Sequence, residues 1–223
     1  MPTVDAALFD VNETLLGLDP VAAAFAAVGL DPRRLDAWFR AVLVDGIAAS
    51  AAGTFANFPD IARHMATAEL AAAGLPTDAG SQDRILETFA TLEVHRDVRP
   101  ALERLHAAGV AAVTLTNGTA GIIRGALERA GLDELVAETW DVTEVGRWKP
   151  APEPYLWAAE RLALAPGRLA LVAVHPWDVH GAQAAGLQGV WIDRHGTGRY
   201  PAHLHPPTVT APDLVAAMGS LIG

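Results

Sequence analysis

The stretch Ala6-Ala7-Leu8-Phe9-Asp10-Val11-Asn12-Glu13-Thr14 decides how the chain is interpreted. Its four apolar residues form a short buried strand that stops at Asp10, and small polar residues follow. Open α/β sheets bind their ligands at the carboxyl ends of their strands. Asp10 is therefore expected at the reactive edge of a sheet, where the Thr14 hydroxyl can hydrogen-bond its carboxylate. Taken alone, Asp10 could equally cap the next helix.

The composition limits the class of protein. The chain has 223 residues, of which 51% are hydrophobic, enough for a sizeable core. It has no Cys, which excludes disulfides and thiolate metal sites, and its net charge of −10 argues against nucleic acid as a partner. It has no apolar run of about 18 residues and no secretory signal pattern, so we expect a cytoplasmic protein without a membrane partner.

A long helical stretch separates the first strand from the rest of the chain. Residues 20–92 are rich in Ala, with apolar residues at helical spacing. The pair Asp31-Pro32 predicts the start of a helix through Arg40, and further helices are predicted over 57–73 and 82–92. An insert of this size next to a strand end favours a cap over an active site, although a packing appendage or a dimer-forming hairpin would give the same pattern.

From Val98 onward, helices and strands alternate, which predicts parallel βαβ units. The expected core therefore comprises residues 1–16 and 95–223, and the expected cap comprises residues 17–94. Residues 194–207 are predicted to be a loop. The predicted helices cover 99–108, 121–130, 153–162, 179–185 and 213–222, and the predicted strands cover 110–115, 136–140, 169–174 and 189–192.

Polar groups also follow the second predicted strand, in Thr114-Leu115-Thr116-Asn117-Gly118-Thr119. The hydroxyl of Thr116, the amide of Asn117 and the backbone at Gly118 are suited to binding an anion without adding charge. An ordinary Asn-Gly turn would explain the same residues.

Two later segments add charged side chains to this edge. Lys149 lies between Trp148 and Pro150, so its position is fixed by a rigid backbone, and its ammonium beside Asp10 would keep that carboxylate ionised. His175 ends another strand and Asp178 opens a helix. Lys149 could instead be incidental to a helix start, and Asp178 could serve only as a helix cap.

In order and spacing, these four segments resemble the haloacid dehalogenase superfamily over essentially the whole chain. The resemblance implies an α/β fold, with a Rossmann-like parallel sheet core, helices on both faces and a helical cap inserted after the first strand. Most members of that superfamily are Mg²⁺-dependent phosphatases, in which a second Asp stands where this chain has Asn12. The phosphatase metal ligand after the fourth strand is also missing, since Ala173 and Val174 occupy its place and only Asp178 remains. We therefore predict no metal and no cofactor.

The (S)-2-haloacid dehalogenases of the superfamily are more similar. They share Lys149 with Tyr155 six residues later, the pair Trp177-Asp178, and an Arg at the position of Arg40. The resemblance implies hydrolytic dehalogenation of a short (S)-2-haloalkanoic acid through an ester on Asp10. A Mg²⁺-dependent phosphatase acting on a small phosphate ester is the alternative, and a noncatalytic binding protein is a third possibility.

The resemblance also implies a role for each residue of the site. Thr14, Lys149, Asp178 and Tyr155 would hold the nucleophile Asp10 in place and charged. Arg40 and Asn117 would receive the halide, although Arg40 could be an ordinary surface residue. The substrate carboxylate would bind Thr116 and the backbone near Asn117 and Gly118, while Trp177 and either Phe55 or Phe58 would form an apolar wall.

Two positions depart from this family. Asn12 stands where the family usually has Tyr, and His175 stands where it has Asn. His175 could orient or activate the hydrolytic water, or it could only fill space beside Pro176 and Trp177. A larger ring at this position would shorten the pocket and favour two-carbon acids such as haloacetates. The resemblance and the apolar cap helices also predict a homodimer.

Overall fold

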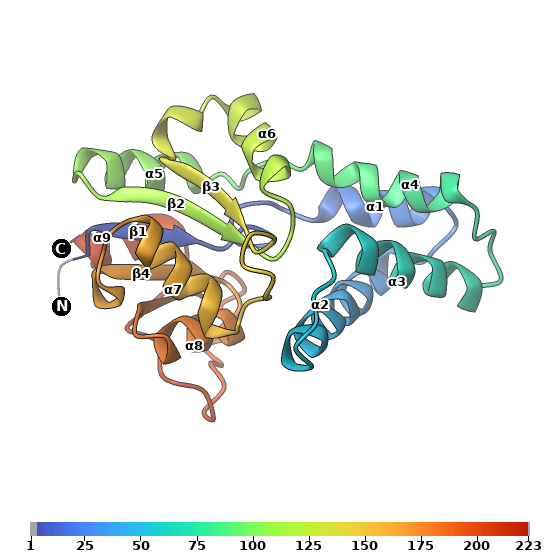
Figure 1. Cartoon of the computed structure of the whole chain (residues 1–223). Helices are drawn as coiled ribbons and strands as arrows, with labels where there is room; N and C mark the ends of the chain where they lie inside the picture. The colour runs from blue at the N-terminus through green and yellow to red at the C-terminus, as the bar shows by residue number, and fades with distance from the viewer. Residues whose placement is uncertain (1–3, 223) are drawn as a thin grey trace.

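A six-stranded parallel sheet forms the centre of the molecule (Figure 1). The structure is a computed structural model, and it describes residues 4–222. The strand order is β3-β2-β1-β4-β5-β6, so β1 lies between β2 and β4. The strands are β1 (Ala6–Phe9), β2 (Ala111–Thr116), β3 (Glu138–Asp141), β4 (Leu169–Ala173), β5 (Gln188–Ile192) and β6 (Val209–Ala211).

Helices cover both faces of this sheet, which explains why β1 and β4 are buried along their whole length. On one face α5 (Val98–Ala107) packs against α9 (Leu214–Ile222), and on the other α7 (Pro152–Arg161) packs against α8 (Pro176–Ala184). A further helix, α6 (Ala120–Ala130), lies against β2 and β3. The predicted α/β fold with a parallel sheet is confirmed.

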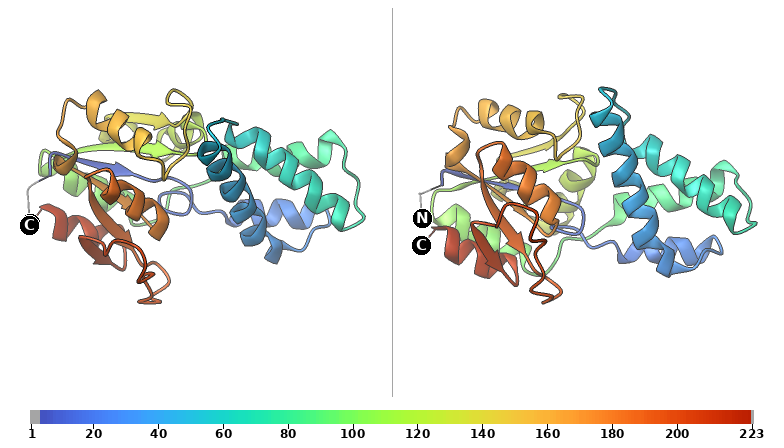
Figure 2. Two further views of the ribbon diagram at one scale, coloured as in Figure 1. Left: turned by 60° about the horizontal axis from the view of Figure 1, so that its bottom comes forward. Right: turned by 90° about the horizontal axis from the view of Figure 1, so that it is seen from below.

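Between β1 and β2 the chain forms a separate group of helices, here called the helical insert (residues 17–94). Figures 1 and 2 show it beside the carboxyl ends of the central strands. Trp38 is fully buried in it, with its ring 5.5 Å from Phe25 and 6.3 Å from Phe89. Among the residues described, no helix has the length and apolar character needed to cross a bilayer. The helices of the insert are α1 (Asp19–Ala27), α2 (Leu35–Ala51), α3 (Phe58–Ala72) and α4 (Ala79–Glu87).

Several element boundaries differ from those predicted. The helix expected from residue 82 begins at Ala79, because the carboxylate of Asp78 accepts the backbone N–H of Ser81 and caps the helix there. The helix expected over 179–185 already begins at Pro176. The edge strand β6 was not predicted, since three residues are too few to show an alternating pattern.

Trp148 anchors the helical insert to the sheet. Its indole N–H donates to the carbonyl of Ala56 at 2.9 Å, and its ring stacks on Phe58 at 6.3 Å. Its backbone N–H donates to the hydroxyl of Ser50 at 2.7 Å. The ring lies so close to α2 that a Cβ at Gly46 would be 2.4 Å from its carbon atoms. Position 46 therefore has to be glycine for the insert to dock in this way.

Substituting Gly46 by Ala should therefore weaken the contact between insert and sheet. We expect G46A to lower the free energy of unfolding by about 1–3 kcal/mol, the usual cost of overpacking a core. Gly121→Ala in α6 is the matched control, because a Cβ there meets no atom within 4 Å. Urea denaturation of the three proteins would measure the difference, and equal midpoints for G46A and G121A would contradict this account of the anchor.

Candidate active site

A fully buried ammonium group lies at the centre of the candidate site. Lys149 is 0% exposed, and its Nζ donates to Asp10 Oδ1 at 2.9 Å, Asp178 Oδ2 at 2.6 Å and the carbonyl of Leu115 at 2.8 Å. Burial works against its charge, but the two carboxylates outweigh burial and raise the pKa of Lys149. All three ammonium donors are used, so this cation is fixed in place.

Asp10 stands directly after β1 and is 5% exposed. Its Oδ2 accepts the hydroxyl of Thr14 at 2.8 Å, and Thr14 Oγ1 in turn accepts the backbone N–H of Val174 at 3.1 Å. Burial opposes ionisation of Asp10, but the charges and hydrogen bonds of Lys149 and His175 hold the pKa of its carboxyl well below the usual range. Asp10 is therefore an ionised, oriented carboxylate in a water-poor environment, as a nucleophile requires.

Asp178 completes the surroundings of Lys149 from the first turn of α8. Its Oδ1 accepts the hydroxyl of Tyr155 at 2.5 Å, and both side chains are fully buried. Burial raises the pKa of Asp178 against the pull of Lys149, and it also raises the pKa of Tyr155 well above its usual value. Tyr155 therefore remains a hydrogen-bond donor that positions Asp178.

His175 joins two carboxylates. Its Nδ1 lies 3.0 Å from Asp10 Oδ2, and its Nε2 lies 2.9 Å from Glu13 Oε2. Burial disfavours the charged ring, but the hydrogen bonds to Asp10 and Glu13 outweigh burial and raise the pKa of His175 to about 10. The ring is also 5.2 Å from that of Trp177. His175 is therefore an imidazolium that donates from both nitrogens, and it does more than fill space.

The groups after β2 are arranged differently from what we expected. The amide of Asn117 brackets the peptide of Lys149, accepting its N–H at 2.8 Å and donating to its carbonyl at 3.0 Å. The backbone N–H of Gly118 donates to Thr116 Oγ1 at 2.8 Å, so this N–H is not free to receive a substrate. The hydroxyl hydrogen of Thr116 remains available as a donor.

A small cavity adjoins Asp10, with a volume of about 10 Å³. This is roughly the space that one water molecule occupies. Asn12 lines it, and the side-chain amide of Asn12 makes no hydrogen bond within residues 4–222. Phe58 forms part of the wall, whereas Phe55 is 37% exposed and does not line the cavity. The cavity is lined by Asp10, Asn12, Phe39, Leu43, Phe58, Thr116, Asn117, His175 and Trp177.

Arg40 does not line this cavity. It is exposed on α2 and lines a wider cleft of about 590 Å³ between the insert and the sheet, here called the outer cleft. His175 and Trp177 line both spaces, so the outer cleft leads to the cavity. The structure thus places Arg40 on the approach to Asp10.

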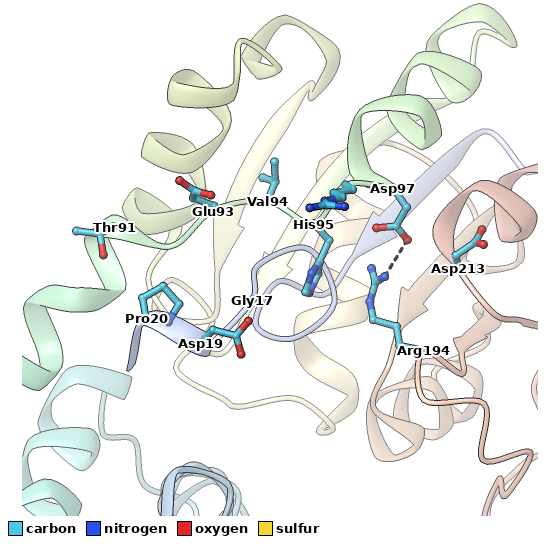
Figure 3. Close-up of a pocket in the computed structure, with 11 residues that line it drawn as sticks. Gly17, Asp19, Pro20, Thr91, Glu93, Val94, His95, Asp97, Arg194 and Asp213 are labelled. Carbon is cyan, nitrogen blue, oxygen red and sulfur yellow. Dashed lines mark hydrogen bonds and ion pairs between the residues drawn. The ribbon is translucent and has the colours of Figure 1, made fainter. Parts of the chain in front are cut away.

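A second groove, of about 780 Å³, lies where two chain segments connect the insert to the sheet (Figure 3). Arg194 lines it and donates to Asp97 Oδ2 at 2.9 Å and to the carbonyl of Thr14 at 2.7 Å. His95 donates its backbone N–H to the carbonyl of Leu15 at 2.8 Å. This groove therefore lies behind the loop that follows Asp10, and its contacts hold that loop in place.

Comparison with known proteins identifies the family. A family model for haloacid dehalogenase-like hydrolases matches residues 4–186. The chain belongs to the haloacid dehalogenase-like hydrolases. It is 29% identical to (S)-2-haloacid dehalogenase 1 of Pseudomonas sp. (strain CBS-3), over 87% of this chain and 86% of that one. It is 27% identical to haloacetate dehalogenase H-2 of Moraxella sp. (strain B), over 88% of each chain. The structure of L-2-haloacid dehalogenase from Xanthobacter autotrophicus with chloropropionic acid covalently bound has the same fold, with a TM-score of 0.89, 21% identity and 99% coverage of both chains.

Glu13 was missed when the sequence of this hydrolase was interpreted. It lies in the loop after Asp10 with φ +63, in the left-handed region that residues other than glycine rarely adopt. Its carbonyl lies 3.2 Å from His95 Nε2, which supports the conformation. The signal available in the sequence was its place three residues after Asp10, but only the fold shows that His175 lies beside it.

Among residues 4–222, no three His, Asp or Glu side chains gather as a metal ion would need.

The raised pKa of His175 predicts how the stability of this hydrolase depends on pH. His175 has a usual pKa of about 6.5, so its ion pairs stabilise the fold fully below that pH and are lost as the pH rises through about 10. As the pH rises between these values, we expect the free energy of unfolding to fall by about 1 kcal/mol per pH unit, because the stabilising charge on His175 is being lost. Urea denaturation across this range should show a shallower decline for His175→Asn. Parallel pH profiles for the two proteins would contradict the charged state assigned to His175.

Proposed function

We propose that this protein is a metal-independent dehalogenase that hydrolyses short (S)-2-haloalkanoic acids, with Asp10 as the nucleophile. The observation that carries the proposal is the buried, ionised Asp10, held by Lys149, Thr14 and His175 beside a small and largely apolar cavity. The activities named for the Pseudomonas and Moraxella relatives support the same reaction. In this proposal the helical insert is the cap domain, residues 17–94. A homodimer in the cytoplasm remains a prediction.

In the first step a carboxylate oxygen of Asp10 attacks the α-carbon of the substrate. A carbon–oxygen bond forms, the carbon–halogen bond breaks, and the halide leaves with the bonding electrons, which inverts the carbon. Trp177 and Phe58 keep bulk water from the carboxylate, which strengthens it as a nucleophile. The product of this step is an ester between Asp10 and the acid.

The same cavity offers groups for each part of the substrate. Thr116 and Asn12 have polar groups available to bind the substrate carboxylate. Asn117 retains one amide N–H after bonding Lys149, and we assign that N–H to the halide. Arg40 would receive the halide from the side of the outer cleft. The ring of His175, which lines the cavity, would shorten it and favour two-carbon acids.

In the second step, water hydrolyses the ester with help from Glu13 and His175. Esterification removes the negative charge of Asp10, and with it one cause of the raised pKa of His175. The ring can then release its Nδ1 proton to solvent and accept another at Nδ1 from the attacking water, while Nε2 keeps its hydrogen bond to Glu13. The hydroxide adds to the ester carbonyl, and the bond from that carbon to the alkoxide oxygen breaks. The alkoxide takes the remaining proton of the water and leaves as the 2-hydroxy acid, which restores the Asp10 carboxylate.

The arrangement around Lys149 also supports a reaction without a metal. Its ammonium lies between the carboxylates of Asp10 and Asp178, the two groups that would otherwise be drawn on to bind a divalent cation. Asn12 cannot serve as the acid and base that a phosphatase would need at this position. These features favour dehalogenation over phosphate ester hydrolysis.

The proposed function predicts halide release in the presence of a chelator. We expect chloride from chloroacetate and from (S)-2-chloropropanoate, little from the (R) enantiomer or 2-chlorobutanoate, and none from Asp10→Asn. Ion chromatography would measure the chloride. If these acids yield none while small esters release phosphate once Mg²⁺ is supplied, the protein is a phosphatase instead.

The assignment of Glu13 and His175 predicts which step fails in their variants. Glu13→Gln and His175→Asn should slow steady-state turnover about 100-fold, the usual contribution of a general base. Because alkylation does not need this base, the ester should accumulate on Asp10 and appear by mass spectrometry as the substrate without its halide. Asp10→Asn is the control that should carry no adduct. Variants that turn over slowly without accumulating ester would show that the pair acts in the first step.

A further inference from the structure

The outer cleft brings Arg40, which the proposed chemistry assigns to the halide, together with Arg199, which that chemistry leaves unused. It is formed by α2 of the helical insert and by the loop after β5, and it leads to the cavity beside Asp10. Arg199 lines it from that loop and is exposed. Neither Arg199 nor Arg40 has an ion-pair partner among the residues described. Two guanidinium groups are thus free to bind an anion at the mouth of the site.

Glu13, His175 and Arg194, which also line the cleft, are already in ion pairs. Arg194 is bonded to Asp97 and to the carbonyl of Thr14, and His175 lies between Asp10 and Glu13. Asp36 is an exception, because it is exposed on α2 one turn before Arg40 and forms no ion pair within residues 4–222. Its carboxylate therefore opposes the binding of an anion in the cleft.

The loop that carries Arg199 is held in shape by Asp193. The carboxylate of Asp193 accepts the backbone N–H of Thr197 at 3.0 Å and that of Gly198 at 2.7 Å. The backbone N–H of Arg199 donates to Thr197 Oγ1 at 3.3 Å, and the hydroxyl of Tyr200 donates to the carbonyl of Pro176 at 3.1 Å. Asp193 is thus engaged with the loop backbone, which leaves the guanidinium of Arg199 without a neighbouring counterion.

A chain with a net charge of −10 repels a carboxylate at long range. Local positive charge in a cleft counters this repulsion and raises the rate of association with an anion. The planar guanidinium also matches a carboxylate with two parallel hydrogen bonds, which a point charge does not. The cavity beside Asp10 has room for about one water and shares His175 and Trp177 with the outer cleft, so a substrate meets the outer cleft first.

We infer that Arg199, together with Arg40, forms an outer binding station for the carboxylate of the substrate, which captures the acid before it reaches Asp10. This inference rests on the proposed function for the identity of the anion, a short-chain monocarboxylate. Arg199 acts on capture and takes no part in bond making or breaking.

Steady-state kinetics with (S)-2-chloropropanoate would test this role. At about 0.01 M ionic strength, where charges act over some 30 Å, Arg199→Ala should lower kcat/KM about 10-fold, with the loss falling on kcat/KM rather than kcat. At about 1 M salt the difference should disappear. Asp36→Asn changes the net charge in the opposite sense and should raise kcat/KM. Arg84→Ala is the matched control, because Arg84 is exposed on α4, outside the cleft, and makes no ion pair among the described residues.

A binding measurement separates this inference from the proposed reaction. Propanoate carries the carboxylate but no halogen, and its association can be followed by stopped-flow tryptophan fluorescence, with Trp177→Phe to assign the signal. Slower association with R199A supports the station even if no substrate is dehalogenated. Halide release with R199A behaving like R84A in both measurements would overturn it, and so would an equal loss of kcat/KM on the uncharged 2-chloropropanamide.

Discussion

The buried ammonium of Lys149 is the interaction on which the rest of the site depends. It contacts groups from the ends of β1 and β2 and from the start of α8, so one cation joins three parts of the sheet edge. Taking such charges out of water is costly, and the cost is met only when every donor and acceptor is paired. Asp10 and Asp178 supply the charge, and Asn117 fixes the backbone of Lys149 through two further hydrogen bonds. Asp10 is therefore charged because its surroundings are complete.

The position of Lys149 also links the charge of Asp10 to the docking of the helical insert. Its neighbour Trp148 packs against Gly46 and Phe58 of the insert and bonds the carbonyl of Ala56. Consecutive residues thus hold the insert with one side chain and Asp10 with the next. A displacement of the insert would disturb Trp148 first and then the ammonium beside it. The cavity beside Asp10 and the ionised state of Asp10 therefore both depend on the two consecutive residues Trp148 and Lys149.

Much of this arrangement could be predicted from the sequence because parallel strands bring their carboxyl ends to one edge. That rule places Asp10, Thr116 and His175 together, and the rigid segment around Lys149 adds the cation. The rule says nothing about which oxygen bonds which donor. The pairing of Gly118 with Thr116, the bracketing of Lys149 by Asn117 and the exposed position of Phe55 all depend on local backbone geometry. Glu13 depends on a left-handed loop conformation that its own sequence gives no reason to expect.

The two cations beside Asp10 differ in what they retain when the carboxylate loses its charge. Lys149 keeps Asp178 as a partner at 2.6 Å in a fully buried position, so its proton stays in place. His175 keeps only Glu13, a half-exposed carboxylate, and burial then works against its charge with less opposition. In the proposed reaction the ester itself would therefore convert His175 from a donor into a base and leave Lys149 as a fixed positive charge near the ester carbonyl. The first step would prepare the second through electrostatics alone, because forming the ester would remove the negative charge that favours the protonated ring of His175.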